Sequence, residues 1–153
     1  MAQKKITRTS QFRMQAEYIL DISTDTVYDT VAGAVVDIKL TAKMNGAKVA
    51  AIALPENAVV ESARMNVLTA FDHATTATVA IGDTVTPTRY LGVTTLKATG
   101  ITNLVPTEYL GLGNPLLLTF AATGADGTVG KFRLTVDYTI SGRANEQFHY
   151  VAN

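Results

Sequence analysis

The stretch that decides the fold class is Lys131–Ile140, which reads Lys-Phe-Arg-Leu-Thr-Val-Asp-Tyr-Thr-Ile. Apolar residues occupy every second position, and charged residues or threonines occupy the positions between them. Side chains of a β-strand point alternately to the two faces of its sheet. The stretch therefore predicts a strand with one buried face and one solvated face.

Shorter stretches of the same character occur along the rest of the chain. Residues 34–44 alternate, and Asn45-Gly46 followed by residues 48–54 predicts a β-hairpin. Further strands are expected at 59–71, 76–81, 90–98 and 115–122, and Glu61 predicts a bulge or an exposed strand end in the first of them. No stretch has a sustained helical period. We therefore expect an all-β protein, an antiparallel β-sandwich or jelly roll.

The two ends of the chain differ from the middle. We expect one sandwich domain over residues 16–141, an extended basic N-terminal arm over residues 1–15 and a C-terminal tail over residues 142–153. In the arm, Lys4, Lys5, Arg8 and Arg13 all precede the first acidic residue, Glu17. Such an arm is either a solvated tail or a segment that docks on an acidic surface or partner chain. Nucleic acid is not an expected partner, because the net charge is zero and no aromatic residues are interleaved with these charges.

The tail carries hydrophobic residues at Phe148, Tyr150 and Val151. Terminal hydrophobic residues fray into solvent unless something holds them. Two arrangements would cover them: addition as a strand to another subunit, or folding back onto the same domain.

Catalytic and metal-binding motifs are absent from the 153 residues. The chain has no Cys, which excludes disulfides, thiolate catalysis and Cys-ligated zinc. Its only histidines are His73 and His149, and no HExxH, GxSxG or P-loop pattern occurs. We expect His73, beside Asp72, to be a surface residue in a polar turn. The sequence predicts no enzyme and no cofactor.

The turns supply the remaining candidates for a ligand. The glycines of residues 124–130 precede a strand and not a helix, so we interpret them as a hairpin turn and not as a phosphate cradle. Asp72, Asp83 and Asp126 are expected to hydrogen-bond their local backbone, with a structural calcium ion as the alternative. Without closer clustering of these carboxylates we predict no metal site. The longest apolar stretch, 115–122, is too short to span a bilayer, and the N-terminus lacks a secretory h-region, so we expect synthesis in the cytoplasm and no membrane partner.

A set of short motifs resembles small structural proteins of tailed-bacteriophage virions. The motifs are Leu54-Pro55, Ala58-Val59-Val60, Thr69-Ala70-Phe71-Asp72, Ala80-Ile81-Gly82-Asp83, Arg89-Tyr90-Leu91, Val136-Asp137-Tyr138 and Gly142-Arg143-Ala144-Asn145-Glu146. The resemblance covers residues 50 to 146 and is nearest to capsid decoration (cement) proteins. It implies a jelly-roll-like domain on the outer capsid surface of the virion, in dimers or trimers, that binds the major capsid protein and stabilises the head.

On this resemblance, the segments that contact partners are the two ends of the chain. The candidate partner-binding residues, chosen for their charge and exposure, are Lys4, Lys5, Arg8, Arg13, Phe148, Tyr150 and Val151. The alternatives are a head-fibre base or tail-associated virion protein, and an enzyme or a carbohydrate-binding module on a β-sandwich.

Overall fold

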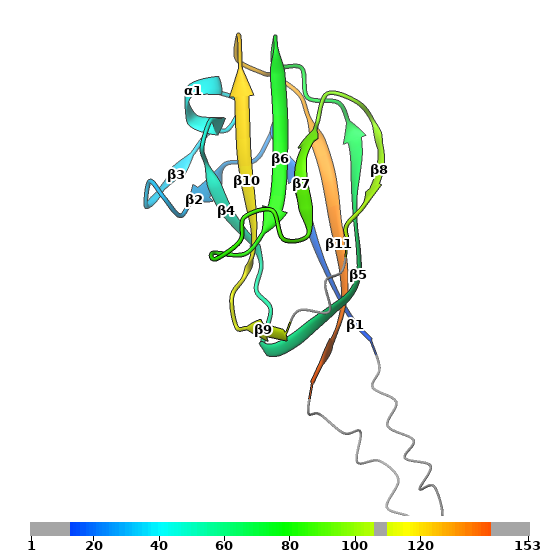
Figure 1. The fold of residues 1–153 in the computed structure, drawn as a ribbon. Coiled ribbons are helices and arrows are strands. Elements are labelled where there is room, and N and C mark those ends of the chain that lie inside the picture. Colours follow the sequence, from blue (N-terminus) through cyan, green and yellow to red (C-terminus); the bar gives the residue numbers. More distant parts are fainter. Residues whose placement is uncertain (1–12, 106–109, 142–153) are drawn as a thin grey trace, which may run out of the picture.

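The computed structural model describes residues 13–105 and 110–141, and nearly all of its regular structure is β (Figure 1). The elements are β1 (Met14–Asp21), β2 (Val27–Asp29), β3 (Ala34–Val36), α1 (Thr41–Met44), β4 (Lys48–Ile52), β5 (Glu56–Thr69), β6 (Thr76–Gly82), β7 (Leu91–Thr95), β8 (Gly100–Asn103), β9 (Leu110–Leu112), β10 (Leu116–Thr123) and β11 (Lys131–Ile140).

Two antiparallel sheets face one another. One has the strand order β1-β11-β5-β8, with β9 also paired to β5, and the other has the order β4-β10-β6-β7. With β9 left aside, the other eight strands of the two sheets are distributed between them, in chain order, as in a jelly roll. A separate two-stranded sheet, β2-β3, lies beside β4. The predicted all-β sandwich of jelly-roll type is confirmed.

The core lies between the inner faces of the two sheets. The inner row predicted for β11 is present, since Phe132, Leu134 and Val136 are fully buried. Thr135 of the predicted solvated row is also buried, and residues 137–140 are half-buried. The Phe132 ring lies 6.2 Å from that of Phe120 and 6.3 Å from that of Phe71, which joins both sheets through one aromatic cluster. Burying each such side chain contributes about 1.5–3 kcal/mol to folding.

The predicted irregularity at Glu61 is a β-bulge in β5. Asp137 of β11 lies opposite Ser62, and the next residue of β11 lies opposite Val60, so Glu61 has no partner in the ladder. Its carboxylate accepts a hydrogen bond of 2.7 Å from the Thr139 hydroxyl. The bulge shifts the inward-facing positions of β5 by one residue, from Ala58 and Val60 before it to Ala63 and Met65 after it. Ser62 therefore lies on the outer face, beside Asp137.

The hairpin predicted around Asn45-Gly46 is wrong. Only β3 is extended, the chain then forms the single turn α1, and β4 pairs with β10. Gly46 takes a φ of +86° as the chain leaves α1. The reason is a tertiary contact: the Thr41 N–H donates to the Asp126 carboxylate at 2.8 Å, and such a contact leaves no mark on local alternation.

The glycine-containing segment 124–130 is not a hairpin turn either, because it runs from β10 in one sheet to β11 in the other. It packs against residues 71–75. A Cβ on Gly130 would lie 2.5 Å from the Phe71 ring, and one on Gly127 would lie 2.6 Å from the His73 ring. Both glycines are therefore required by close packing.

His73 is a buried residue, which corrects the prediction of a surface position. Its side chain is fully buried, and its ring stacks on that of Phe71 with centroids 6.3 Å apart. Neither ring nitrogen has a hydrogen-bond partner among the described residues. Phe71 and His73 are buried, whereas Asp72 between them is exposed. Leaving a buried polar group unsatisfied costs about 1–3 kcal/mol.

The exposed carboxylate of Asp72 fixes the segment 124–130, which connects the two sheets, to residues 71–75. Its carboxylate accepts hydrogen bonds from the Thr128 hydroxyl at 2.6 Å, the Thr128 N–H at 2.7 Å and the Val129 N–H at 3.0 Å. The hydrogen bond from the Thr128 side chain is the largest cause that lowers the pKa of Asp72 to about 2. The ionised carboxylate is therefore the form that stabilises this contact.

Replacing Asp72 with Asn is expected to remove an acid-dependent part of the stability. A lowered pKa stabilises the fold above the ordinary carboxyl value, and that contribution is lost as the pH falls from about 4 to about 2. Because Asp72 is exposed and solvent screens it, we expect a loss of only about 1 kcal/mol at pH 7.

Urea unfolding between pH 2 and pH 7 measures this effect. Asp72→Asn should flatten the pH dependence in the acid range. The control Glu56→Gln alters an exposed carboxylate whose side chain makes no hydrogen bond within the described part of the chain, and it should leave the dependence unchanged. Equal acid sensitivity of Asp72→Asn and the wild type would contradict the assignment.

Candidate interaction site

The pairing of β1 with β11 brings the two ends of the domain together. Met14, the first residue of β1, lies opposite Tyr138, two residues before the end of β11. The segments 1–12 and 142–153 therefore join the domain at the same end of one sheet. The sequence predicted two separate partner-binding segments, and the topology attaches them side by side.

Most of the predicted partner-binding residues lie outside the described residues. These are Lys4, Lys5 and Arg8 at one end and Phe148, Tyr150 and Val151 at the other. Arg13 is described, is exposed and directly precedes β1. Their role as partner-binding residues stays a prediction.

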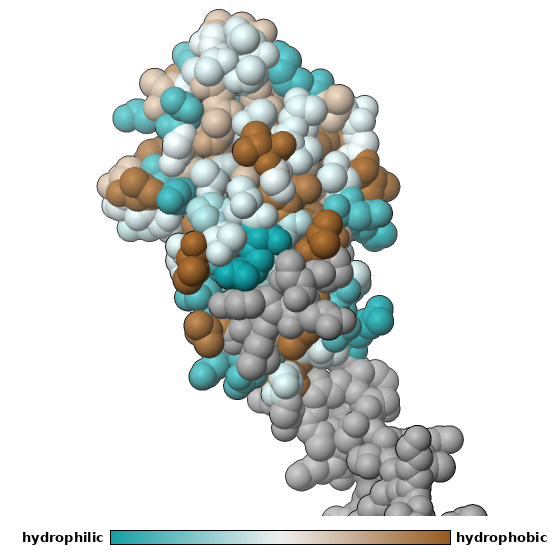
Figure 2. All heavy atoms as spheres, in the orientation of Figure 1, coloured by the Kyte–Doolittle hydropathy of each residue, from teal (hydrophilic) through white to brown (hydrophobic). Residues whose placement is uncertain are grey.

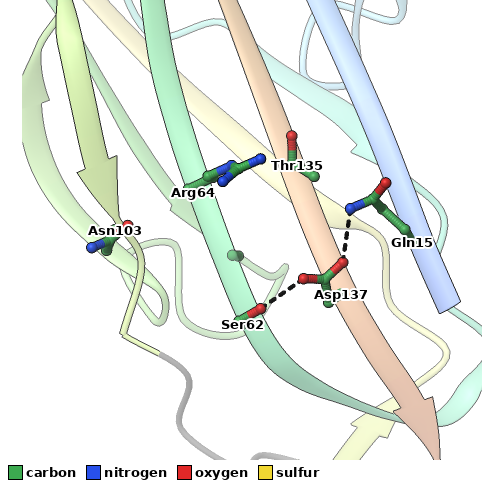
Figure 3. Close-up of a pocket in the computed structure, with 7 residues that line it drawn as sticks. Gln15, Ser62, Arg64, Asn103, Thr135 and Asp137 are labelled. Atoms are coloured by element: carbon green, nitrogen blue, oxygen red, sulfur yellow. Dashed lines mark hydrogen bonds between the residues drawn. The ribbon is translucent and has the colours of Figure 1, made fainter. Parts of the chain in front are cut away.

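A polar hollow lies on the outer face of this sheet, close to the same end. Its volume is about 230 Å³, and four strands contribute to its wall. Figure 3 shows six of its lining residues, which are Gln15 from β1, Ser62 and Arg64 from β5, Asn103 from β8, and Thr135 and Asp137 from β11. The hollow is a feature of the assembled sheet, because no two neighbouring strands supply all of these side chains.

Asp137 is the central acceptor of the hollow. Its two carboxylate oxygens receive hydrogen bonds from the Gln15 amide at 3.0 Å and from the Ser62 hydroxyl at 2.8 Å (Figure 3). Both donors are uncharged, and within residues 13–105 and 110–141 the carboxylate forms no ion pair. It therefore retains the capacity to accept a hydrogen bond from a partner.

The two carboxylates on the outer face of β1 are paired with cations of β11. Lys131 Nζ lies 3.3 Å from Asp21, and Arg133 Nε lies 3.6 Å from Glu17. The row of ion pairs ends at the hollow, where the carboxylate lies on β11, at Asp137, and the β1 residue opposite it is the uncharged Gln15. Exposed ion pairs of this kind add little stability.

Arg64 supplies the positive charge of the hollow. Its guanidinium is exposed and extends toward Thr135 in Figure 3, and no ion pair is formed with it in the described part of the protein. The hollow thus offers a guanidinium donor and a carboxylate acceptor that are not paired with each other. Amide and hydroxyl groups surround them, a combination suited to hydrogen-bonding a polar protein surface.

Sequence reasoning missed this hollow. The only available signal was the polar row of Lys131–Ile140, in which Thr135 and Asp137 fall on the face predicted to be solvated. The residues that complete the wall come from strands distant in sequence. Their convergence follows from the strand order β1-β11-β5-β8.

Other kinds of site receive no support from the geometry. The described residues contain no group of three or more His, Asp or Glu side chains arranged to hold a metal ion. Asp83 accepts hydrogen bonds from the neighbouring Val85 and Thr86 N–H groups, as predicted for a turn residue. Asp126 accepts one from the Thr41 N–H, which is distant in sequence, so the local role predicted for Asp126 is wrong. In the same part of the chain, the helical structure includes nothing long and apolar enough to cross a membrane.

Comparison with known proteins gives a match by structure. No protein-family model matches the chain, and no curated protein does. A chain of the cyanophage Pam1 capsid asymmetric unit superposes with a TM-score of 0.59, at 19% identity, over 92% of each chain. A chain of the Ralstonia phage GP4 capsid gives a TM-score of 0.52 at 13% identity, covering 94% of this protein and 93% of that chain.

A third match is a chain of the acid-stable capsid of Helicobacter pylori bacteriophage KHP30. It gives a TM-score of 0.50 at 17% identity, covering 83% of this protein and 92% of that chain. The fold is one found in phage capsids. These matches span the whole sandwich, so the likeness concerns the complete architecture and agrees with the resemblance to phage virion proteins noted in the sequence.

Proposed function

We propose that this protein is a phage capsid decoration (cement) protein. In this proposal it binds the outer surface of the shell formed by the major capsid protein and stabilises the head. The observation that carries the proposal is the shared fold, which extends over more than 90% of two chains found in phage capsids and of this protein. The sequence resemblance to virion proteins supports the same role.

The arrangement of the termini supports a docking role for one end of the domain. The N-terminal arm with Lys4, Lys5, Arg8 and Arg13 is proposed to contact acidic groups of the shell. The tail with Phe148, Tyr150 and Val151 is proposed to contact a second copy, in a dimer or trimer. Both segments join the domain beside the polar hollow, so the arm and the tail would extend from the same end of the sandwich.

Binding to undecorated capsids tests the proposal. Capsids assembled without this protein are mixed with increasing amounts of purified protein and sedimented. We expect saturable binding, with a limiting ratio fixed by the number of shell subunits, and a higher temperature of shell disruption when the sites are filled.

The alternatives predict other outcomes in the same experiment. A head-fibre base or tail-associated protein would bind only a few copies per particle or remain with the tail fraction. A carbohydrate-binding module would leave capsids unbound and give a saturable signal on a glycan array. Either result would replace the decoration role.

A further inference from the structure

The small sheet β2-β3 projects from the side of the sandwich and has one open edge (Figure 1). Its strand β2 is fixed to β4, because the Thr30 N–H donates to the Lys48 carbonyl at 2.8 Å and the Lys48 N–H donates to Asp29 at 3.1 Å. Beyond β3, no strand of the described residues is paired. The backbone groups on that side of β3 are available to a further strand.

The same sheet exposes apolar side chains. Tyr28 and Val35 lie opposite each other across the two strands and are 56% and 66% exposed, and Val31 in the connecting turn is 66% exposed. From Thr30 to Val36 the chain carries no charged residue. Figure 2 shows brown surface at the left, where Figure 1 places this sheet. Natural proteins usually protect an open edge with charged residues, proline or a covering segment. The edge of β3 has neither a charged residue nor a proline.

A second uncharged edge, that of β7, makes a useful comparison. It carries Val93, which is 73% exposed, but β7 belongs to a four-stranded sheet and its Thr95 lies opposite the polar Thr78. The sheet β2-β3 has only two strands of three residues each. Two-stranded sheets are marginal, and a third strand stabilises them. The edge of β3 is therefore the better acceptor.

We propose that residues 147–151 of a second copy add to the edge of β3 as a third strand. Phe148 and Tyr150 are two positions apart, so both side chains of an extended segment fall on one face, where they continue the apolar row of Tyr28 and Val35. Residues 147–153 carry no Lys, Arg, Asp or Glu, which matches the uncharged edge.

The length of the tail permits this exchange. Phe148 follows the last residue of β11, Ile140, by eight positions, which is a reach of about 26 Å for an extended chain. Exchange of a terminal strand between identical copies is a low-cost route to a closed oligomer. The inference rests on the proposed subunit contact of the tail and is independent of binding to the shell.

Disulfide trapping between two variants tests the inference, and the absence of Cys makes each introduced thiol unique. Val35→Cys and Tyr150→Cys proteins are prepared separately, mixed in equal amounts and oxidised. We expect the mixed covalent dimer to predominate over both homodimers, because a disulfide requires the two Cβ atoms to approach within about 4.5 Å. Mixing two single variants detects contact between copies only.

The matched control is Val93→Cys, an equally exposed valine on the edge of β7. Mixed with Tyr150→Cys, it should give no dominant mixed dimer. Absence of the Val35→Cys/Tyr150→Cys dimer, equal trapping at Val93, or a dominant Val35→Cys homodimer would each overturn the inference.

Truncation gives a second, independent measurement. Removing residues 147–153 is expected to convert the oligomer to a monomer in sedimentation velocity, with the circular dichroism spectrum unchanged. Retained self-association would overturn the inference even if capsid binding were intact. Loss of capsid binding with retained disulfide trapping would instead argue against the decoration role alone.

Discussion

Replacing Gly82 with alanine is expected to lower the free energy of unfolding by about 3 kcal/mol. Gly82 ends β6, and the loop that follows folds back onto it. A Cβ at this position would lie 2.1 Å from the Thr86 carbonyl oxygen and 2.3 Å from the Pro87 carbonyl carbon. Both are backbone atoms, so no side-chain rotation relieves the overlap and the loop itself must move.

Moving the loop also disrupts a buried ion pair. Asp83 accepts hydrogen bonds from the Thr86 N–H at 2.6 Å, the Val85 N–H at 2.8 Å and Arg89 Nε at 2.6 Å. Burial acts to raise the pKa of Asp83, but these hydrogen bonds outweigh it and the pKa is lowered. Displacing Thr86 would leave a buried carboxylate with fewer donors, which adds to the steric cost.

Urea unfolding followed by circular dichroism measures the loss, since the chain has no Trp. With a slope of about 2 kcal/mol/M, the midpoint should fall by about 1.5 M. Gly92→Ala is the matched control, because Gly92 lies in the neighbouring strand β7 and a Cβ there meets no atom within 4 Å. Equal midpoints for the two variants would contradict the packing of the loop on Gly82.

Neutralising the basic arm is expected to weaken binding to undecorated capsids by about 30-fold, taking about 0.5 kcal/mol for each exposed charge contact. The variant replaces Lys4, Lys5, Arg8 and Arg13 with Gln. Its affinity should also depend less on salt than that of the wild type, because exposed charges are screened by ions. Sedimentation of capsids at several salt concentrations gives both quantities.

Two double variants distinguish the effect of charges in the arm from the effect of lowering the net positive charge anywhere on the protein. Lys4→Gln/Lys5→Gln and Lys39→Gln/Lys43→Gln each remove two positive charges, but the second pair lies at and before α1, away from the arm. Only the first should weaken binding. If both weaken it equally, or if the fourfold variant binds as the wild type does, the arm is a solvated tail. Deletions should stop at residue 12, because β1 begins at Met14.

The sequence predicts well those parts of the fold in which the pattern of apolar and polar residues within one strand determines which face is buried. Alternation identified β11 because its inner side chains Phe132, Leu134 and Val136 meet the core, although Thr135 between them is buried as well. The bulge at Glu61 was visible because a charged residue interrupted an apolar face. In both cases the residues that determine the structure lie within the strand itself, so the sequence of that strand is enough to predict it.

The wrong predictions involve contacts between distant segments. Residues 34–44 alternate like a strand, yet the contact of Thr41 with Asp126 fixes a helical turn there. His73 was expected in solvent because it lies beside Asp72 in a predicted polar turn, whereas the segment 124–130 covers it at Gly127. The polar hollow depends on four strands at once. None of these contacts has a local signature in the sequence.

A density map of the intact phage particle tests the central claim most directly. The decoration role predicts density for this jelly roll on the outer surface of the head, in contact with major capsid protein subunits and repeated with the symmetry of the shell. Density confined to the tail or to the base of a head fibre, or no density on the shell, would contradict it.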